Sequence, residues 1–550
     1  MAKLRIIPLG GIGEIGKNIT AFEYGDDVIV VDCGAIFPRQ DMLGIDLVIP
    51  DVTYLVNNRE RVRAYLFTHG HEDHIGAVPY VFPRVPAPVY GTKLTCALIR
   101  GKLMDHNISG IHMQVVKPRD TVQIGSFSVQ FIKVSHSIAG AVAMAITCPA
   151  GTVIVTGDFK IDYTPIDGEV TDLGTLAAWG NKGVLALMAD STNVERPGYT
   201  MSEKKIAETF RDHFKDAKRR IIIAMFASNL HRIQQVVELC VEYKRKICFV
   251  GRSMINVTKL AMEIGELKIP QDVYVELADL DCYEDHEIVV LTTGSQGEPM
   301  SGLTRMANSE HRRLQIREGD TVIISATPIP GNEIMVARIL DQLYRRGANV
   351  IYNRIADVHV SGHACQEELK LIQALVRPKY FIPVHGEYRM LRRHAQIAVD
   401  MGMPKDNAII LEMGQALELS KDEANITGPI PTGSVMVDGL GVGDVGNVVL
   451  RDRKHLSQDG LIIVVIGVSK ETGRVTSGPE LISRGFVYVR ENEELIAGVR
   501  NVAMGVLSRY ETITQSDWTA IKNGIKDEMH DYLYGLIKRN PMILPIIMET

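Results

Sequence analysis

Four apolar stretches of the chain, each with the character of a β-strand, end directly before or one residue before a histidine or an aspartate. Such runs of β-branched and aromatic residues, bounded by turn residues, are typical of strands. Residues at the carboxyl ends of strands can converge on one rim of a sheet, so the pattern predicts one polar site there. The stretches are Ala64 to Thr68 before His69, Phe127 to Val134 before Ser135-His136, Thr152 to Thr156 before Gly157-Asp158, and Lys379 to Val384 before His385.

The first of these strand ends concentrates ligand-type residues: His69, His71, Asp73 and His74 follow one another within a single turn. Imidazole nitrogen and carboxylate oxygen are ligands of Zn²⁺ and related ions, and a compact turn lets one segment reach two adjacent ions. The alternative is a His-rich polar surface loop. The recurrence of His and Asp at three other strand ends argues against that alternative, so we predict a metal site here.

Residues 203–354 show alternating helical and extended patterns, which is typical of a mostly parallel α/β domain. Ser202 is placed to cap a helix that carries Ile206, Phe210 and Phe214 on one face. Because the strand before His385 lies beyond this region, we interpret it as a domain inserted into a metal-binding domain formed by residues 1–202 and 355–440. Predicted strands 221–226, 247–250, 288–291, 322–325 and 350–352 alternate with predicted helices 229–243, from 253, and 333–346.

Two glycine-rich stretches raise the question of phosphate binding. Residues 10–16 match a dinucleotide-binding fingerprint at Gly11, Gly13 and Gly16, but that site needs a helix to begin at the glycines. A hairpin pattern over residues 19–32 follows instead and argues against a dinucleotide. Residues 293–298 follow an apolar strand; they can open a helix and offer backbone N–H groups to a phosphate, or form an ordinary connection.

Composition bounds the class of protein. At 550 residues the chain should form several domains, and its 46% hydrophobic and 23% charged residues are ordinary for globular proteins. Its seven cysteines contain no C-x-x-C pair, which argues against a disulfide framework. The N-terminus lacks a signal-peptide core and no apolar run is long enough to span a bilayer, so we expect a cytoplasmic protein without a membrane anchor. With a net charge of −6, attraction to nucleic acid must come from local patches or bound metal.

The last part of the chain has the pattern of a separate small domain. Glycine and proline between residues 428 and 446 indicate a linker, placed at 441–455, before a C-terminal domain at 456–550. Strands are predicted at 461–468 and 485–489, and two helices follow. The domain carries no cluster of catalytic residue types, so we expect dimerisation or RNA contact there. The first helix carries Leu495, Val499, Val502 and Val506, and the second carries Trp518, Ile521, Ile525 and Met529.

Together, these motifs resemble a known superfamily. His69-x-His71-x-Asp73-His74, with His136, Asp158 and His385, is similar to the metallo-β-lactamase fold, an αββα sandwich with two metals at one edge. Residues 189–193, 361–363 and 383–387 resemble the three motifs of the β-CASP nucleases, and residues 10–16, 43–46, 293–299 and 541–549 are similar to the bacterial ribonuclease J family. The resemblance covers nearly the whole chain. It implies an α/β protein with this sandwich, an inserted α/β β-CASP domain and a small C-terminal α/β domain.

The resemblance also implies a ligand set and a reaction. Two Zn²⁺ would bind, and the same ligands admit Mn²⁺. A hydroxide between the ions would attack the scissile phosphodiester. His363 would stabilise the transition state or donate a proton to the leaving group, and Asp190 would orient a ligand histidine. The implied ligands are His69, His71 and His136 for one ion, Asp73, His74 and His385 for the other, and Asp158 as a bridge.

A pocket for a 5′-monophosphate is implied as well, and with it 5′-to-3′ exonuclease action on single-stranded RNA, in mRNA decay and rRNA maturation. Endonuclease action would follow where RNA threads the cleft. Further expectations are a structural Ca²⁺ held by Leu43, Ile45 and Asp438, a homodimer or homotetramer joined through the C-terminal domain, and contact with other RNA-degradation proteins. The pocket would use Ser228, Asn229, Leu230, His359, Val360, Ser361, Gly362 and His363, together with Gly294, Ser295 and Gln296.

Three other functions fit parts of the pattern. A non-catalytic RNA-binding subunit of a degradation complex would not need the intact ligand set. A small-molecule metallo-hydrolase shares the fold but would not need the large insert. A DNA nuclease shares the catalytic motifs, although the ribonuclease J motifs favour RNA.

Overall fold

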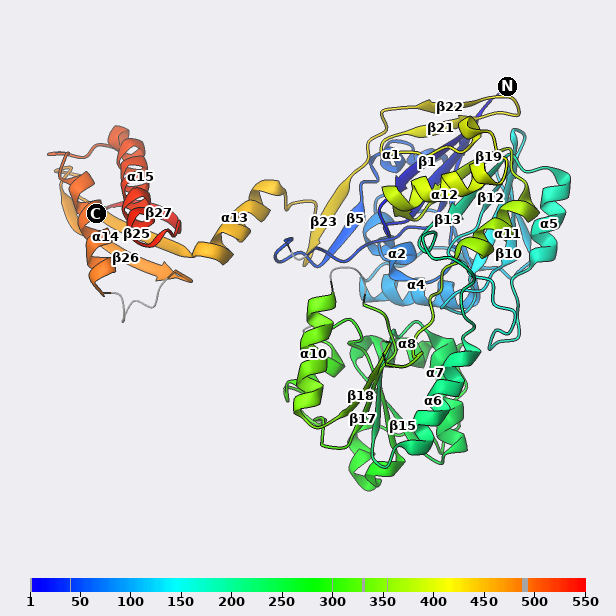
Figure 1. Ribbon diagram of the computed structural model, residues 1–550. Coiled ribbons are helices and arrows are strands. Elements are labelled where there is room, and N and C mark those ends of the chain that lie inside the picture. The colour runs from blue at the N-terminus through cyan, green and yellow to red at the C-terminus, as the bar shows by residue number, and fades with distance from the viewer. Residues whose placement is uncertain (1, 40, 299, 329–331, 354, 487–492) are drawn as a thin grey trace. The chain divides into compact units, whose positions relative to one another are not determined.

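The structure, a computed structural model, describes residues 2–39, 41–298, 300–328, 332–353, 355–486 and 493–550 (Figure 1). The chain forms two compact units. Unit 1 comprises Met1–Ile36 and Val48–Val435, and unit 2 comprises Phe37–Leu47 and Met436–Thr550. Within the described ranges, no helix has the length and apolar character needed to cross a bilayer.

Unit 1 contains a sheet of eight strands in the order β22-β21-β1-β3-β4-β6-β7-β8. Neighbours from β22 to β4 are antiparallel, and β4, β6, β7 and β8 run parallel. The hairpin predicted after the glycine stretch is confirmed by β3 and β4, so no helix begins at those glycines. The strands are β1 (Leu4–Gly10), β3 (Ile19–Tyr24), β4 (Asp27–Val31), β6 (Val62–Leu66), β7 (Val89–Gly91), β8 (Met113–Val115), β21 (Ala416–Leu419) and β22 (Ala424–Thr427).

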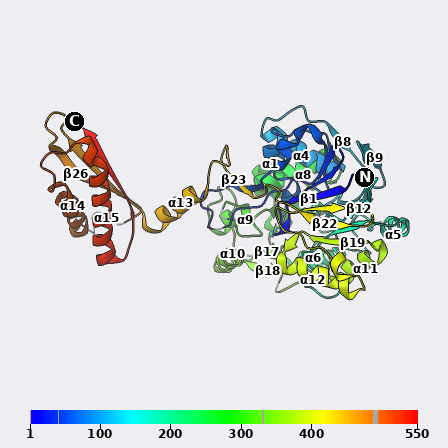
Figure 2. The same ribbon diagram turned by 90° about the horizontal axis from the view of Figure 1, so that it is seen from above.

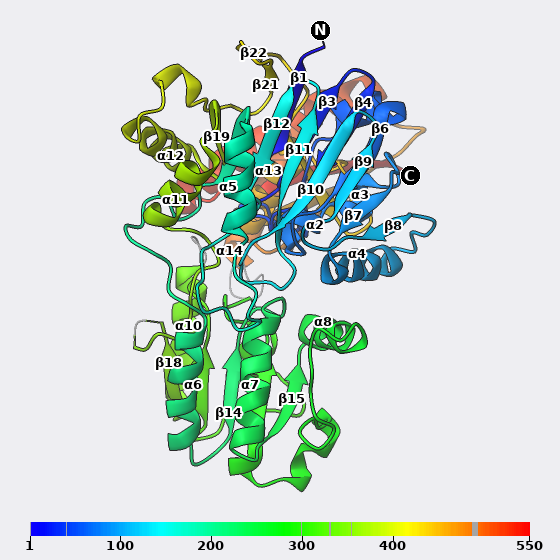
Figure 3. The same cartoon turned by 90° about the vertical axis from the view of Figure 1, so that its right-hand side faces the viewer.

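A second sheet of six strands, ordered β19-β13-β12-β11-β10-β9, packs on the first. Ile6 and Phe22 of the first sheet share one core cluster with Phe131 and Met144 of the second. Helices α5 (Leu173–Lys182), α11 (Gln366–Val376) and α12 (Tyr388–Asp400) cover the other face of the second sheet, and Figure 3 shows α5 and α12 on that side. The predicted αββα sandwich is thus confirmed. The strands are β9 (Thr121–Ile124), β10 (Phe127–Lys133), β11 (Val142–Cys148), β12 (Gly151–Val155), β13 (Ala186–Asp190) and β19 (Tyr380–Val384).

Several short helices and strands lie next to the first sheet or connect its strands. Helix α4 (Lys93–Asp105) lies against β7 and β8, α3 (Val78–Val81) packs on α4, and α1 (Thr53–Asn57) follows β5 (Leu47–Pro50). The glycine stretch forms β2 (Ile12–Gly13), which pairs in parallel with β20 (Gly386–Glu387). This pairing brings the beginning of the chain next to the segment that carries His385.

The inserted region is a five-stranded parallel sheet in the order β15-β16-β14-β17-β18. Alternate strand residues face opposite sides: Ile221 and Ile223 pack with α6, α7 and α8, whereas Ile222 and Ala224 pack with α9 and α10. Figure 3 shows α6 and α7 on the same face of this sheet. The elements are β14 (Ile221–Ala224), β15 (Lys246–Val250), β16 (Ile288–Thr292), β17 (Thr321–Ile324), β18 (Asn349–Tyr352), α6 (Lys204–Asp216), α7 (Leu230–Glu242), α8 (Arg252–Glu263), α9 (Gly302–Ala307) and α10 (Glu333–Arg345).

The predicted alternation of strands and helices in the insert is confirmed, with two differences. The N-cap of α6 is Glu203 rather than the predicted Ser202, and no side chain caps the helix; Ser202, one residue earlier, accepts a hydrogen bond from the Lys204 amide at 3.2 Å. The segment 293–298 does not open a helix: α9 begins only at Gly302, capped by Ser301. Positive φ angles at Gly294 (+109°) and Gly297 (+79°) belong to a turn rather than to a right-handed helix.

Unit 2 is built on a three-stranded sheet in the order β26-β25-β27. Strand β25 (Leu461–Val468) is antiparallel to β26 (Val475–Arg484) and parallel to β27 (Met542–Glu549). Helices α14 (Glu493–Leu507) and α15 (Trp518–Ile537), both predicted, pack on one face of the sheet; Figure 2 shows them side by side. Strand β26 was not predicted, and residues 487–489 of the predicted strand 485–489 lie outside the described residues. The predicted linker 441–455 contains most of a helix, α13 (Asn447–Asp459), after the hairpin of β23 (Ser434–Asp438) and β24 (Gly441–Val442).

Candidate metal centre and active site

The turn after β6 is held in shape by backbone contacts from other parts of unit 1. Asn18 donates its backbone N–H to the Asp73 carbonyl at 2.9 Å, and Cys33 donates to the His74 carbonyl at 2.7 Å. A Cβ on Gly34 would lie 1.6 Å from the Asp73 carbonyl oxygen, so only glycine fits beside the turn. Helix α2 (Glu72–Ile75) then begins with His71 as its N-cap. The turn therefore presents its side chains from a fixed backbone.

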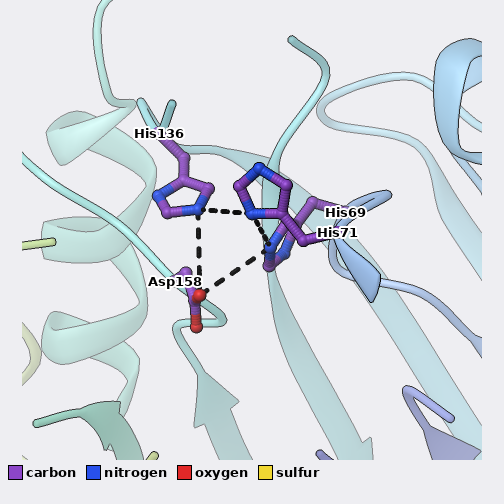
Figure 4. Close-up of side chains that lie close together, drawn as sticks. All are labelled: His69, His71, His136 and Asp158. Atoms are coloured by element: carbon purple, nitrogen blue, oxygen red, sulfur yellow. Dashed lines mark hydrogen bonds and ion pairs between the residues drawn. The ribbon is translucent and has the colours of Figure 1, made fainter. Parts of the chain in front are cut away.

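The first ligand cluster consists of three imidazoles and one carboxylate (Figure 4). Nδ1 of His71 lies 3.1 Å from Nε2 of His69 and 3.1 Å from Nε2 of His136. Oδ2 of Asp158 lies 3.7 Å from Nε2 of both His69 and His136. His136 follows β10 and Asp158 follows β12, as the strand-end pattern predicted. Four ligand atoms thus converge on one point.

The second cluster shares Asp158 and adds Asp73, His74 and His385. Oδ2 of Asp73 lies 3.2 Å from Nε2 of His385, and Oδ2 of Asp158 lies 3.3 Å from Nε2 of His74. His385 follows β19 with φ at 54°, a left-handed conformation that is uncommon for a residue with a side chain. Its amide donates to the Gly11 carbonyl at 2.9 Å, so pairing with the glycine stretch holds it there.

In the first cluster the imidazoles are held neutral. Burial lowers the pKa of His71 to about 4 and of His136 to about 3, and it lowers the pKa of His69 well below its ordinary range. A neutral imidazole has one nitrogen lone pair to offer, which is the form that binds a metal. Ring nitrogens of His69 and His136 each lie 3.1 Å from Nδ1 of His71, so their lone pairs could bind the same cation.

In the second cluster negative charge dominates. Burial opposes protonation, yet the carboxylates of Asp158 and Asp73 raise the pKa of His74 well above its ordinary range. Burial also acts to lower the pKa of His385, but the carboxylates of Asp158, Asp190 and Asp73 raise it to about 10. The buried carboxylates favour a positive charge at this point, and a divalent cation would supply it. The donor types and the charge of both clusters therefore form a divalent-metal site.

Asp32 supports the site and was not identified from the sequence. Its Oδ2 lies 2.8 Å from Nδ1 of His74, and its two oxygens accept hydrogen bonds from the backbone N–H and the hydroxyl of Thr68 at 2.8 and 2.9 Å. Asp32 is buried and has φ at 60°. It directly follows β4, so the strand-end pattern that identified the ligands could have indicated it. A carboxylate on the far nitrogen of a ligand histidine fixes the ring's tautomer and orientation.

Asp190 lies where it contacts two histidines at once. Its Oδ2 lies 2.7 Å from Nδ1 of His363, and its Oδ1 lies 3.3 Å from Nδ1 of His385. The hydroxyl of Thr192, also not predicted, lies 2.9 Å from the same nitrogen of His385. Asp190 thus contacts the predicted ligand His385, and its role in orienting that histidine stays a prediction.

His363 sits at the edge of the clusters, with 20% of its side chain exposed. Burial opposes its protonation, but the carboxylates of Asp190 and Asp158 raise its pKa above the ordinary value. The carbonyl oxygen of its neighbour Gly362 accepts a hydrogen bond from Nδ1 of His136 at 2.8 Å. A Cβ on Gly362 would lie 2.6 Å from the His136 ring, so the close approach requires glycine. His363 is thus held beside the metal ligands, where the neighbouring carboxylates favour its protonated form.

The residues predicted for a phosphate pocket lie at the carboxyl ends of the parallel strands. Asn229 caps α7 by accepting a hydrogen bond from the Arg232 amide, and Leu230 is the first residue of that helix. The Arg232 guanidinium lies 3.3 Å from Nδ1 of His359 and donates to the Ser325 carbonyl at 3.1 Å. The structure therefore brings the start of α7 next to the end of β17 and to His359.

The other predicted pocket residues lie nearby in the fold. Ser361 accepts a hydrogen bond from the Asn193 side chain at 2.8 Å, and Val360 is buried. Ser295 and Gln296 are buried after β16, and the Gln296 amide donates to the Thr327 carbonyl at 3.0 Å. Ser228 is half-buried just before α7.

A buried ion pair stands behind the start of α7 and was not predicted. The Arg232 guanidinium makes two hydrogen bonds, both 2.9 Å, to the carboxylate of Glu203. The side chains are 1% and 5% exposed. Such bidentate pairs fix geometry as well as charge. No sequence signal joins these residues, because 29 positions separate them.

The predicted calcium ligands lie together in unit 2. The Arg453 side chain donates to the Leu43 carbonyl at 3.0 Å and forms an ion pair with Asp438. The Ile45 amide donates to the Met42 carbonyl at 3.3 Å. In the structure, Arg453 supplies the positive charge that the expected Ca²⁺ would bring.

Comparisons with known families cover the chain in four parts. Residues 12–192 match the model of the metallo-beta-lactamase superfamily, and residues 218–343 match the beta-CASP domain of ribonuclease J. Residues 348–410 match the RNA specificity domain of Zn-dependent metallo-hydrolases, and residues 448–550 match the ribonuclease J C-terminal domain.

Proteins that match the chain over nearly its whole length are named ribonuclease J or J2. Ribonuclease J2 of Bacillus subtilis is 44% identical over 100% of this chain and 99% of its own length. Ribonuclease J of Synechocystis is 42% identical over 100% of this chain and 87% of its own, and ribonuclease J of Thermus thermophilus is 41% identical over 99% and 95%. A solved structure of a protein of unknown function from Enterococcus faecalis shares the fold, with a TM-score of 0.53 and 18% identity over 76% of this chain and 100% of that one.

Proposed function

Since the chain belongs to the ribonuclease J family and is a metal-dependent ribonuclease, we propose that it degrades RNA in the 5′-to-3′ direction, starting from a 5′-monophosphate. The observation that carries this proposal is the segment from His359 to His363. One end contacts Arg232 beside the start of α7, and the other end contacts Asp190 in the metal site. This five-residue segment would thereby connect the proposed anion pocket to the metal centre.

The shortness of the segment from His359 to His363 limits the distance between the proposed anion pocket and the metal ligands. His359 and His363 are four positions apart, so a fully extended chain would separate them by at most about 14 Å. A terminal phosphate bound at the start of α7 would therefore place a linkage near the 5′ end at the metal ligands. Backbone N–H groups and the dipole of a 13-residue helix favour an anion at that start.

The metal site would hold two ions, Zn²⁺ or Mn²⁺, with His69, His71 and His136 around one, Asp73, His74 and His385 around the other, and Asp158 between them. When bound, such ions lower the pKa of water and neutralise phosphate charge. His363 would then give its proton to the leaving oxygen, since the nearby carboxylates favour its protonated form. Asp190 would keep the ring turned toward the substrate.

The same site would cut internally where single-stranded RNA can enter without a free 5′ end. In the cell these activities would serve mRNA decay and rRNA maturation, in the cytoplasm. RNA contact by the inserted domain is supported by the loops that gather at the carboxyl ends of β14, β16 and β17.

The test compares two RNAs that differ only in their 5′ end, one with a monophosphate and one with a triphosphate. We expect mononucleotide release from the first and slow turnover of the second, with and without added Zn²⁺ or Mn²⁺. His71→Ala is the inactive control. Equal resistance of both RNAs, with stoichiometric metal on the protein and tight RNA binding, would instead support a non-catalytic RNA-binding subunit.

The C-terminal domain would join copies of the chain. Among its described residues, none belongs to either ligand cluster, and sixteen of them form a buried core that supports independent folding. Self-association is therefore the role we propose for it, and sedimentation of the full chain over a range of concentrations tests this.

A further inference from the structure

A third group of metal-ligand side chains lies beside the two clusters described above. Asp158, Asp190, His363 and His385 each place one donor atom within 4.8 Å of the donor atoms of the other three. Asp158 and His385 also belong to those clusters, whereas Asp190 and His363 belong to neither. The third group therefore brings two further side chains of ligand type to the same centre.

The two shared side chains turn different atoms toward the third group. Asp158 approaches Nε2 of His74 in the second cluster with Oδ2, at 3.3 Å, but approaches Nδ1 of His385 with Oδ1, at 3.4 Å. His385 approaches Asp73 with Nε2, at 3.2 Å, but approaches Oδ1 of Asp190 with Nδ1, at 3.3 Å. Oδ1 of Asp158 and Nδ1 of His385 therefore stay available when Oδ2 and Nε2 bind the two proposed ions.

Asp190 and His363 form a close donor pair next to these atoms. Oδ2 of Asp190 lies 2.7 Å from Nδ1 of His363, which in turn lies 3.9 Å from Oδ2 of Asp158. Two ligands of one tetrahedral ion, each bound at about 2.0–2.2 Å, are about 3.3–3.6 Å apart. The separations in the third group lie on both sides of this value, so small side-chain movements would let one ion bind between the donor atoms.

Burial and charge favour a cation at this place. Asp158 and Asp190 are each 2% exposed, and His385 is 4% exposed. A buried carboxylate is costly unless it is paired with a positive charge or coordinates a metal. His363 is 20% exposed, so the group can receive an ion from solvent. Carboxylate oxygen and imidazole nitrogen are ligands that both Zn²⁺ and Mn²⁺ accept.

We propose that Asp190, His363 and Asp158 form a third site for a divalent ion, Zn²⁺ or Mn²⁺, beside the two-ion centre. This rests on the proposed two-ion centre and adds a weaker site to it. The ligand atoms are a carboxylate oxygen of Asp190, Nδ1 of His363 and Oδ1 of Asp158. His385 is not a ligand of the third ion, because a neutral imidazole has one lone pair and Nε2 uses it for the second ion. Its ring N–H would donate to Asp190 instead.

Two features make the third site weaker than the other two sites. It offers three protein ligands, whereas each of the two clusters offers four. A third divalent ion would also be repelled by the two cations beside it. The site should therefore fill only when the metal is present in excess.

Filling the third site should stop turnover. Asp190 holds His363 through a contact of 2.7 Å, and an ion bound to both side chains would push these two atoms apart. His363 would then leave the position from which we propose that it acts on the leaving oxygen. The metal that activates the protein at low concentration should therefore inhibit it in excess.

A titration of the full-length chain with Mn²⁺ tests the site. Electron paramagnetic resonance detects free Mn²⁺ and so counts the bound ions at each concentration. We expect two tightly bound ions and a third that binds at least about 10-fold more weakly. His363→Ala should keep the two tight ions and lose the third. His106→Ala, which removes an exposed histidine outside the three groups, is the matched control and should bind all three.

Two further measurements use the original chain and do not depend on a variant. RNA cleavage should fall by half at the Mn²⁺ concentration that half-fills the third site. Crystals grown with excess Mn²⁺ should show a third anomalous peak between Asp190 and His363, and its absence overturns the site. Far-UV circular dichroism checks that His363→Ala is folded.

The outcomes separate the third site from the two-ion centre. Only two bound ions at every concentration, or a third ion that persists in His363→Ala, overturns the third site and leaves the two-ion centre standing. Loss of a tight ion in His363→Ala also overturns it, because His363 would then belong to the two-ion centre. Cleavage that stays unchanged while the third site fills overturns the inhibition. Fewer than two tight ions in the original chain contradicts the proposed two-ion centre, on which the third site rests.

Discussion

Oδ2 of Asp32 lies 2.8 Å from Nδ1 of His74, so a carboxylate outside the ligand clusters fixes the ring of one ligand histidine. The same carboxylate holds the Thr68 backbone, so it also fixes the start of the metal-binding turn.

Replacing Asp32 by Asn keeps the side chain's shape but removes its charge. We expect metal affinity and RNA turnover to fall by about 10- to 100-fold, the range found for partners of ligand histidines. Metal titration and RNA cleavage with excess metal measure the two effects. Asp51→Asn serves as the control, because the carboxylate of Asp51 accepts its hydrogen bonds from Thr53, away from the metal ligands. Unchanged metal affinity in the Asp32 variant would contradict the assigned role.

The two ligand clusters predict how metal is lost when single ligands are replaced. His71→Ala should remove one equivalent of metal, and His385→Ala the other, because these side chains belong to different clusters. Asp158→Asn should lower both, since Asp158 belongs to each cluster. Mass spectrometry of metals in dialysed protein gives the stoichiometry. Loss of both ions in His71→Ala and in His385→Ala alike would show that the sites do not bind independently.

The buried ion pair of Arg232 and Glu203 leads to a prediction about the free energy of unfolding of single and double variants. Arg232→Met should destabilise unit 1 by about 3–5 kcal/mol, because the Glu203 carboxylate is left buried and unpaired. Adding Glu203→Gln should recover part of this loss. The double variant should still show a raised KM for 5′-monophosphate RNA with a smaller change in kcat, as His359 loses its contact. Urea unfolding and steady-state kinetics provide both readouts. Equal stability of the single and double variants would contradict the coupling.

Glu23 predicts a dependence of stability on pH away from the metal site. It pairs with Arg5 at 2.9 Å and Arg61 at 2.7 Å and accepts a hydrogen bond from the Tyr54 hydroxyl. Burial acts in the opposite direction, but these partners lower the pKa of Glu23 below its ordinary value. The stabilisation is thus present above the unfolded-state pKa, about 4.3, and is lost as pH falls through the lower folded-state pKa.

Glu23→Gln should therefore cost about 1.5–3 kcal/mol at pH 7, and the difference from the original chain should shrink under acid conditions. A Trp518→Phe background leaves Trp179 as the only tryptophan, so its fluorescence follows unit 1. Glu60→Gln is the control, because that side chain is 87% exposed. A difference that stays constant from pH 7 to pH 3 would contradict the assignment.

The sequence predicted those site residues that lie close together in the chain or directly after a recognisable strand. His69 to His74 form one turn, and His136, Asp158 and His385 each follow a recognisable strand. Asp32 also follows a strand, but its partner His74 lies 42 residues away and nothing local joins them. Contacts of this kind become visible only when the parallel strands are placed side by side.

The fold was predictable where a periodic apolar pattern existed. Helix α6 buries Ile206, Phe210 and Phe214 as expected. Helix α13 buries no residue, so it leaves no apolar periodicity and was interpreted as linker. Strand β26 was missed because its first residues, Val475 to Gly478, are mixed and exposed.

The placement of β1 has a consequence for how the chain acquires its structure during synthesis. Strand β1 pairs on one side with β3, but on the other side with β21, where Leu4 meets Leu419. At about 5–20 residues per second, roughly 20–80 s pass on the ribosome before that partner exists. Until then the first sheet has an open edge, and the site lacks His385 until residue 385 has been added. A nascent chain would therefore remain without nuclease activity until nearly the whole of unit 1 has been made.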